Sequence, residues 1–165
     1  MDKHFRVPRW EEIPDVDLYL DQVISLIDGS IGQYVNEDGK KALTKTMVNN
    51  YVKHKIIEAP DKKKYSKLSV ASLFVITILK SSFSINEIGE LIKLALVAND
   101  TEISYNQFCE VLEDAVRTVF AGESLSMRGE LNEPQYILRN VCRTFACSLY
   151  VKETYFKKEK FEIEK

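Results

Sequence analysis

The segment from Leu68 to Leu79 limits the possible folds of this chain more than any other. Its apolar residues recur on nearly every side of a predicted helix, which leaves little surface for solvent. They are Leu68, Ala71, Phe74, Val75, Ile78 and Leu79. A helix of this kind is stable only when neighbouring elements enclose it. The sequence therefore predicts a helical core arranged around this segment.

The predicted helices on both sides of this segment have clear start signals. Thr44 precedes one helical pattern, and its hydroxyl is placed to accept a hydrogen bond from a free amide of the first turn. Ser84 and Glu87 form a capping box, in which each side chain satisfies a backbone amide of the other residue. Pro60 and Asp61 open a turn before the central helix. Three successive helices are therefore predicted between residues 40 and 93.

Another helical pattern precedes these three. Its apolar residues recur at intervals of three and four, and Asp15 or Asp17 is the predicted N-cap. Gly29 and Gly32 each weaken a helix by roughly 1 kcal/mol relative to alanine, so the helix could break there. Residues 1–14 contain Pro8 and Pro14 and are predicted to be irregular.

The last third of the chain contains two amphipathic patterns. Ser104 with Gln107 is predicted to start the first of them, Gly122 to end it, and Asn132 to start the second. No strand is predicted apart from a minimal hairpin after Pro60. The expected fold class is therefore all-α. We expect one helical region with an N-terminal arm at residues 1–100 and a helical extension at residues 101–165.

Charge is distributed very unevenly along the chain. Nine lysines lie between Lys40 and Lys67, against only Glu58 and Asp61, so this window has a net charge of +7. The whole chain has a net charge of −2, which leaves −9 outside the window. Clustered cations attract polyanions, although a solvated lysine-rich surface would have the same composition. The lysines flank both a predicted helix and the turn after it, which favours a binding surface.

The same stretch resembles the winged helix-turn-helix domain of the MerR family of bacterial regulators. VNNYVKHKII, from Val48 to Ile57, is similar to the end of that family's second helix. Lys64 and Tyr65 stand where the family has an arginine and a tyrosine at the end of its wing. The most specific match is FSINEIGELI, from Phe83 to Ile92. The whole chain more closely resembles an uncharacterised bacterial family of MerR-like proteins that share an opening like PRWEEIPDVDLYLDQVI.

This resemblance implies a DNA-binding transcriptional regulator that reads duplex DNA with the helix at residues 44–54. Asparagine can form two hydrogen bonds to an adenine edge, whereas lysine mostly meets phosphate. The predicted base contacts are Lys45, Thr46, Asn49 and Asn50. The predicted phosphate contacts are Lys41, Lys53, Lys62, Lys63 and Lys64. The chain departs from the family pattern where Asn49 replaces an arginine, Asn50 an aromatic residue and Lys55 a glycine, and its wing is short.

Other chemistry is not predicted. The two histidines and three cysteines lack metal-ligand spacing, and no phosphate-binding glycine loop or hydrolase motif is found, so neither a metal, a cofactor nor an enzymatic activity is expected. Cys109, Cys142 and Cys147 are expected to be reduced, and the better interpretation makes them buried structural residues. No secretory signal or membrane span is found, which predicts a cytoplasmic protein.

Two alternatives to the DNA-binding regulator remain open. The first is a protein-interaction adaptor that keeps the MerR-like scaffold but no longer reads DNA, docking through its C-terminal helices. The second adds an effector pocket between those helices, although its aromatic residues have the spacing of ordinary core. They are Tyr105, Phe108, Phe120, Tyr136 and Phe145. The large apolar surface of the C-terminal patterns also predicts a homodimer.

Overall fold

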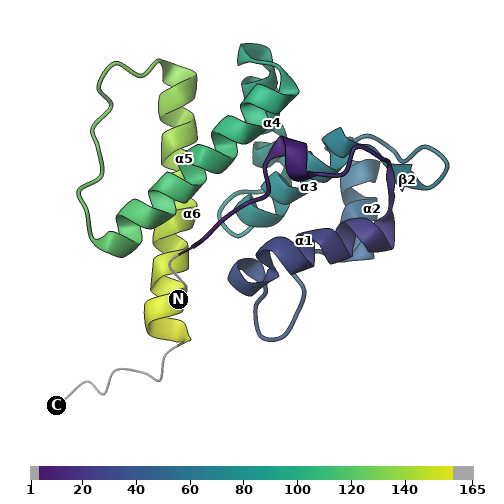
Figure 1. The fold of residues 1–165 in the computed structure, drawn as a ribbon, viewed down its shortest axis with the longest axis horizontal. Coiled ribbons are helices and arrows are strands. Elements are labelled where there is room, and N and C mark those ends of the chain that lie inside the picture. Colours follow the sequence, from purple (N-terminus) through teal and green to yellow (C-terminus); the bar gives the residue numbers. More distant parts are fainter. Residues whose placement is uncertain (1–3, 158–165) are drawn as a thin grey trace. The chain divides into compact units, whose positions relative to one another are not determined.

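The computed structural model describes residues 4–157, and these residues are mostly helical, with one two-stranded sheet (Figure 1). The expectation of a broadly all-α fold is confirmed. The chain forms two compact units, one of residues 7–107 and one that combines the described parts of 1–6 and 108–165. The predicted functional division between residues 100 and 101 stays a prediction.

The centre of the first unit is α3 (Lys67–Leu79), the helix predicted to be enclosed. Ser66 caps its N-terminus, because the Ser66 hydroxyl accepts a hydrogen bond from the amide of Ser69 at 3.2 Å. Phe74 and Leu73 are fully buried, and α1 (Leu20–Val35) and α4 (Ile85–Ala98) both pack against α3. Burying an apolar side chain of this size contributes about 1.5–3 kcal/mol. The apolar segment therefore does form the core of this unit.

The predicted caps on either side of α3 are confirmed. Thr44 precedes α2 (Lys45–Lys53), and its hydroxyl accepts from the Met47 amide at 3.3 Å. At the start of α4, the Ser84 hydroxyl accepts from the Glu87 amide at 3.3 Å. The Glu87 carboxylate in turn accepts from the Ser84 amide at 2.7 Å, which lowers the pKa of Glu87. Both helices therefore begin where the sequence placed them.

The start of α1 differs from the prediction. Neither Asp15 nor Asp17 caps the helix, because residues 18 and 19 form a short strand, β1 (Leu18–Tyr19), and α1 begins only after it. β1 pairs antiparallel with β2 (Lys64–Tyr65), Leu18 opposite Tyr65. β2 thus pairs with β1, and its first residue, Lys64, also pairs with Asp61 across the short turn before it. Local sequence patterns did not predict the pairing of β1 with β2, because its two partners lie far apart in the chain.

Helix α1 also continues through both glycines. Gly32 is buried, and a Cβ atom there would lie 2.7 Å from the Asp28 carboxylate and 2.9 Å from the Asn36 amide. These two side chains form a hydrogen bond of 2.8 Å across the glycine. The absence of a side chain at Gly32 therefore leaves room for this polar contact, and the suggested break at Gly29 or Gly32 was wrong.

The N-terminal arm is held by contacts within the first unit. Trp10 lies in a 3-10 helix (Trp10–Glu12), and its amide donates to the Asn106 side chain at 2.8 Å. The Tyr105 hydroxyl donates to the carbonyl of Pro8 at 2.8 Å, and the rings of Trp10 and Tyr105 meet edge to face. The Lys67 ammonium lies 5.0 Å from the centre of the Trp10 ring. Trp10 thus anchors the arm to this unit.

The C-terminal helices are α5 (Thr101–Ala121) and α6 (Glu133–Val151), followed by a π-helical turn (Lys152–Phe156). α5 starts before the predicted box, because the Asp100 carboxylate accepts from the amide of Ile103 at 2.9 Å. The Ser104 hydroxyl instead donates to the carbonyl of Ala95 at 3.0 Å. The predicted end at Gly122 and the predicted cap at Asn132 are both confirmed.

Two cysteines fit their predicted structural role and one does not. Cys109 and Cys142 are buried, whereas Cys147 is exposed, so the expectation of burial was wrong for Cys147. Burial raises the pKa of the Cys142 thiol strongly, with a smaller effect from Cys109. Tyr105, Phe108 and Phe145 are also buried, as ordinary core residues are.

Candidate nucleic-acid interface

Helix α2 has one buried and one exposed face. Val48 and Tyr51 are buried, and burial raises the pKa of the Tyr51 hydroxyl. The predicted DNA-contacting residues of the helix are all exposed. They are Lys45, Thr46, Asn49, Asn50 and Lys53. The sequence pattern therefore separated the two faces of this helix correctly, and the polar face is accessible to a partner.

The structure divides the lysines of the basic stretch, apart from Lys64, into two groups. In the first group each lysine has an aspartate partner from residues 15–28. Lys41 pairs with Asp28 at 3.1 Å and Lys45 with Asp21 at 2.8 Å. Lys67, the third member, pairs with Asp15 at 2.6 Å. Part of the positive charge seen in the sequence is therefore balanced by the acidic segment before it.

Lys64 is a separate case. It belongs to β2 and is half-buried, and its ammonium lies 5.0 Å from the centre of the Tyr19 ring in β1. A cation over an aromatic face is attracted by the ring quadrupole, by about 0.5–1 kcal/mol where the pair is in contact with solvent. The Lys64 ammonium therefore already contacts a residue of β1, the strand with which β2 pairs.

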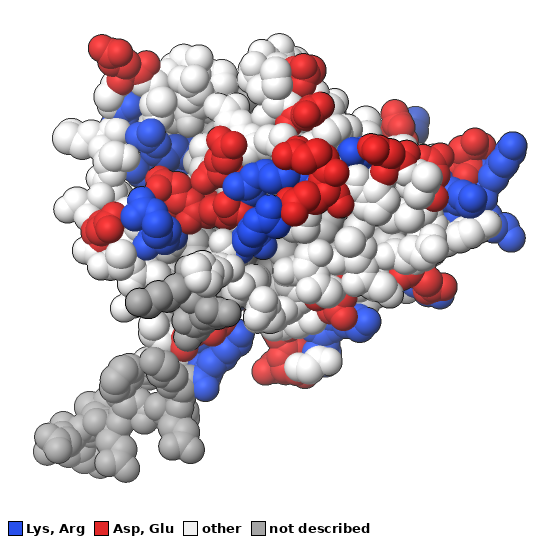
Figure 2. All heavy atoms as spheres, viewed as in Figure 1, with Lys and Arg blue, Asp and Glu red and all other residues white. Residues whose placement is uncertain are grey.

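The second group of lysines has no such partners. Within the described part of the chain, Lys40, Lys53, Lys55, Lys62 and Lys63 form no ion pair, and all five are exposed. Lys40 lies before α2, and the other four lie at the end of α2 and in the turn before β2. Lys and Arg atoms project at the right-hand edge of the face drawn in Figure 2, where Figure 1 places that turn. The charge available to a polyanion is concentrated here.

The turn before β2 has an unusual backbone. The amide of Asp61 donates to the carbonyl of Lys64 at 3.0 Å, and the amide of Lys64 donates back to Asp61 at 2.8 Å. The two residues between them have positive φ angles, +46° at Lys62 and +66° at Lys63. Positive φ at both central positions is typical of a type I′ turn, which favours asparagine, aspartate and glycine. Each lysine costs about 1–2 kcal/mol there, because its Cβ approaches the following carbonyl oxygen.

The end of α2 has the same feature. The amide of Ile56 donates to the carbonyl of Tyr51 at 2.9 Å, and that of Lys55 donates to Val52 at 3.0 Å. This pair of hydrogen bonds is the Schellman motif, in which glycine is the usual residue at the left-handed position. Here that residue is Lys55, with a φ of +56°. The adjacent Ile56 packs on α4, since a Cβ atom built on Gly89 would lie 3.2 Å from its Cδ1 atom.

Equivalent motifs elsewhere in the chain contain the favoured residues. The turn from Glu37 to Lys40 has the same reciprocal hydrogen bonds, of 3.2 and 2.8 Å, around Asp38 and Gly39. Their φ angles are +50° and +73°. At the end of α5, Gly122 occupies the left-handed position of a second Schellman motif, with a φ of +67°. Four described residues other than glycine have positive φ, and three of them are lysines of the basic stretch.

Lys55 was not among the predicted contacts. The sequence contained a signal for it, because lysine stands where the resembling family has glycine, but this was interpreted only as a departure from the pattern. The lack of ion pairs at Lys53, Lys55, Lys62 and Lys63 within the described residues could not be predicted, since the pairing of the other lysines depends on the tertiary structure.

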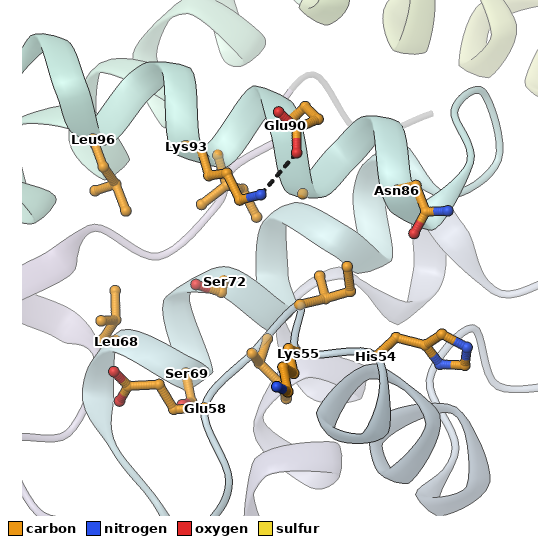
Figure 3. A pocket seen from close by; sticks show the side chains of 14 residues that line it. His54, Lys55, Glu58, Leu68, Ser69, Ser72, Asn86, Glu90, Lys93 and Leu96 are labelled. Atoms are coloured by element: carbon orange, nitrogen blue, oxygen red, sulfur yellow. Dashed lines mark hydrogen bonds and ion pairs between the residues drawn. The ribbon is translucent and has the colours of Figure 1, made fainter.

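A groove of about 420 Å³ lies beside the end of α2, between α3 and α4 (Figure 3). Leu68 and Leu96 face each other at one end of it, and Asn86 and His54 lie at the other. Lys93 and Glu90 form an ion pair of 2.8 Å on its rim. The groove can accept an apolar group, but its charged residues are of both signs. It therefore does not indicate the class of a ligand.

No group of three or more histidine, cysteine, aspartate or glutamate side chains among the described residues could hold a metal ion. Among those residues, too, no helix is long and apolar enough to cross a membrane.

Comparison with known proteins gives one match. The family model of DUF1836, a domain of unknown function, matches residues 8–112. This match covers most of the chain, so the protein belongs to the DUF1836 family. The matched region includes all the lysines described above. No curated protein and no solved structure matches the chain.

Proposed function

We propose that this protein is a DNA-binding transcriptional regulator that reads duplex DNA with the exposed face of α2. The observation that carries the proposal is the group of four unpaired, exposed lysines at the end of α2 and in the following turn. They lie close in sequence to Asn49 and Asn50, which are exposed on the same helix. Cations that flank hydrogen-bonding side chains suit a duplex, whose phosphates lie on both sides of its base edges. The MerR-like sequence pattern supports the same function.

Within this proposal, the lysines contribute unequally. Lys41 and Lys45 have to give up their ion pairs with Asp28 and Asp21 before meeting a phosphate. Lys62 and Lys63 have no ion pair with any residue that the structure describes. We therefore expect the turn to contribute more to affinity than the first turn of α2. The base contacts proposed from the sequence are retained for Thr46, Asn49 and Asn50, with Lys45 the least favourable of the four.

The test is a fluorescence-anisotropy titration of random duplex DNA at two salt concentrations. Each lysine that meets a phosphate releases condensed counterions, so log affinity falls with log salt at about −0.9 per contact. Replacing Lys62 and Lys63 by alanine should make this slope shallower by roughly 2. The matched control is Lys41→Ala with Lys45→Ala, which removes equal charge from paired lysines and should change the slope less.

A loss of DNA binding must be separated from a loss of folding. Tyr51 and Ile88 are buried, so Tyr51→Ala or Ile88→Ala should lower stability before any direct effect on DNA is seen. The lysine variants should keep the helical circular dichroism of the wild type. Wild-type protein without salt-dependent affinity for any duplex would contradict the proposal and favour the adaptor.

We also propose that the protein forms a homodimer through its C-terminal helices. Several large apolar side chains near the end of α6 are exposed, notably Tyr150, Val151 and Phe156. Exposed apolar surface of this kind is often covered by a partner. A light-scattering mass near 19.0 kDa at micromolar concentration, unchanged on dilution, would contradict a dimer.

A further inference from the structure

Three lysines occupy left-handed backbone positions in two unrelated motifs. Lys55 ends a helix, whereas Lys62 and Lys63 form a turn. Glycine or asparagine would make the same backbone hydrogen bonds at these positions with less strain. The motifs share no local geometry that calls for lysine. Their common property is an exposed side chain whose ammonium group has no ion pair among residues 4–157.

Backbone strain of this kind persists only when the surrounding structure enforces it, and it is concentrated at functional sites. We propose that Lys55, Lys62 and Lys63 form one set of DNA-phosphate contacts, and that the fold accepts strained backbone at all three positions to place the cations. This inference rests on the proposed DNA binding and adds Lys55 to the contacts. It also states why lysine stands at positions that favour glycine.

The backbone of Lys55 is held from both sides. On one side, the hydrogen bonds to Tyr51 and Val52 tie it to α2. On the other, Ile56 packs closely on Gly89 of α4. A side chain that starts from a fixed backbone loses less freedom when it binds, so its contact is stronger for the same charge. Lys55 is thus a better anchor than a lysine in a free loop.

Another explanation for Lys55 is the helix dipole, because a cation near the C-terminus of a helix is stabilising. The two explanations predict opposite changes in stability for Lys55→Gly. If the dipole were the reason for the lysine, glycine would lower the melting temperature. If the lysine is instead present for DNA binding, at the cost of a strained backbone, glycine would raise the melting temperature. The melting temperature therefore discriminates between them without any DNA.

The experiment compares Lys55→Gly with wild type in thermal unfolding and in anisotropy titration of random duplex DNA. We expect the melting temperature to rise by about 3 °C. We expect affinity at 0.1 M salt to fall about eightfold, and the salt slope to become shallower by about 0.9. Lys55→Arg keeps the cation on the same backbone and should bind within about twofold of wild type, as expected when one cation replaces another at a phosphate.

Asp38→Gly is the matched control, because Asp38 also has a positive φ, of +50°, but carries no positive charge and is a residue that tolerates this backbone. It should change the melting temperature less than Lys55→Gly does and leave DNA binding unchanged. Lys55→Gly that binds DNA like wild type would overturn this inference and leave the proposed function intact. The same holds if glycine lowers the melting temperature. Wild-type protein that binds no duplex would overturn both together.

Discussion

The turns at residues 37–40 and 61–64 have the same backbone and opposite chemistry. Both close with two reciprocal hydrogen bonds around two residues of positive φ. The first turn contains Asp38 and Gly39, the residues that this geometry favours, and the second contains Lys62 and Lys63. The comparison teaches that the fold can require a particular turn geometry without determining which residues form the turn. For the second turn, we propose that lysines are present because they bind DNA phosphates.

The largest expected effect comes from giving the second turn the residues of the first. Lys62→Asp with Lys63→Gly should remove two phosphate contacts and weaken duplex binding about 50-fold at 0.1 M salt. It should also raise the free energy of unfolding by about 1–2 kcal/mol, since both new residues tolerate left-handed backbone better. Anisotropy titration and denaturant unfolding measure the two effects. An unchanged affinity would mean that the turn does not contact DNA.

The next largest effect distinguishes the role of α2 from that of the second turn, because only α2 is expected to recognise the DNA sequence. Asn49→Ala or Asn50→Ala should lose about 1–3 kcal/mol on a preferred duplex, with little change on random DNA. The turn variant should instead weaken binding to every sequence alike, because phosphates carry no sequence information. Selection of preferred duplexes from a random pool, followed by titration, measures the difference. Equal losses on both kinds of DNA would remove the asparagines from the base contacts.

A smaller effect is expected from putting lysine into the first turn. Gly39→Lys should lower the free energy of unfolding by about 1 kcal/mol, because Gly39 has a φ of +73°. The matched control is Gly29→Lys, which adds the same charge within α1, where no atom lies within 4 Å of an added Cβ. That variant should gain a few tenths of a kcal/mol from better helix propensity. Denaturant unfolding of both variants measures the contrast, and equal stabilities would show that strain in this turn is negligible.

The smallest expected effect is a loss of stability at low pH, when Asp28 beside the first turn becomes protonated. The side-chain hydrogen bond from Asn36 and the contact with Lys41, on either side of the first turn, hold the pKa of Asp28 below its ordinary value of 3.8. The lowered folded pKa means that Asp28 contributes stability above pH 3.8, and that this contribution is lost as pH falls through the folded pKa. NMR titration should find the lowered pKa, and Asn36→Ala should return it toward the ordinary value.

Local rules in the sequence predicted much of the fold. The caps at Thr44, Ser84 and Asn132 and the enclosed helix α3 depend on neighbouring residues, and all four are confirmed. The pairing of Leu18 with Tyr65 depends on distant residues, and it moved the start of α1. The hydrogen bond across Gly32 likewise requires the fold to be known.

The candidate site was predicted less completely than the fold. The exposed face of α2 followed from helical periodicity. The ion pairs of Lys41 and Lys45 did not, because their aspartates belong to another element. In the sequence, Lys55 was only a departure from the family pattern. Its φ of +56° shows that lysine at this position strains the backbone.

The pairing of β1 with β2 has a consequence for how the protein folds. Leu18 can meet Tyr65 only after the intervening chain, which includes α1 and α2, has closed into a loop. Closing a long loop costs entropy before its contacts repay it, and contacts between distant residues slow folding. We therefore expect α1 and α2 to gain protection from hydrogen exchange first, and the lysine-rich turn to be ordered last.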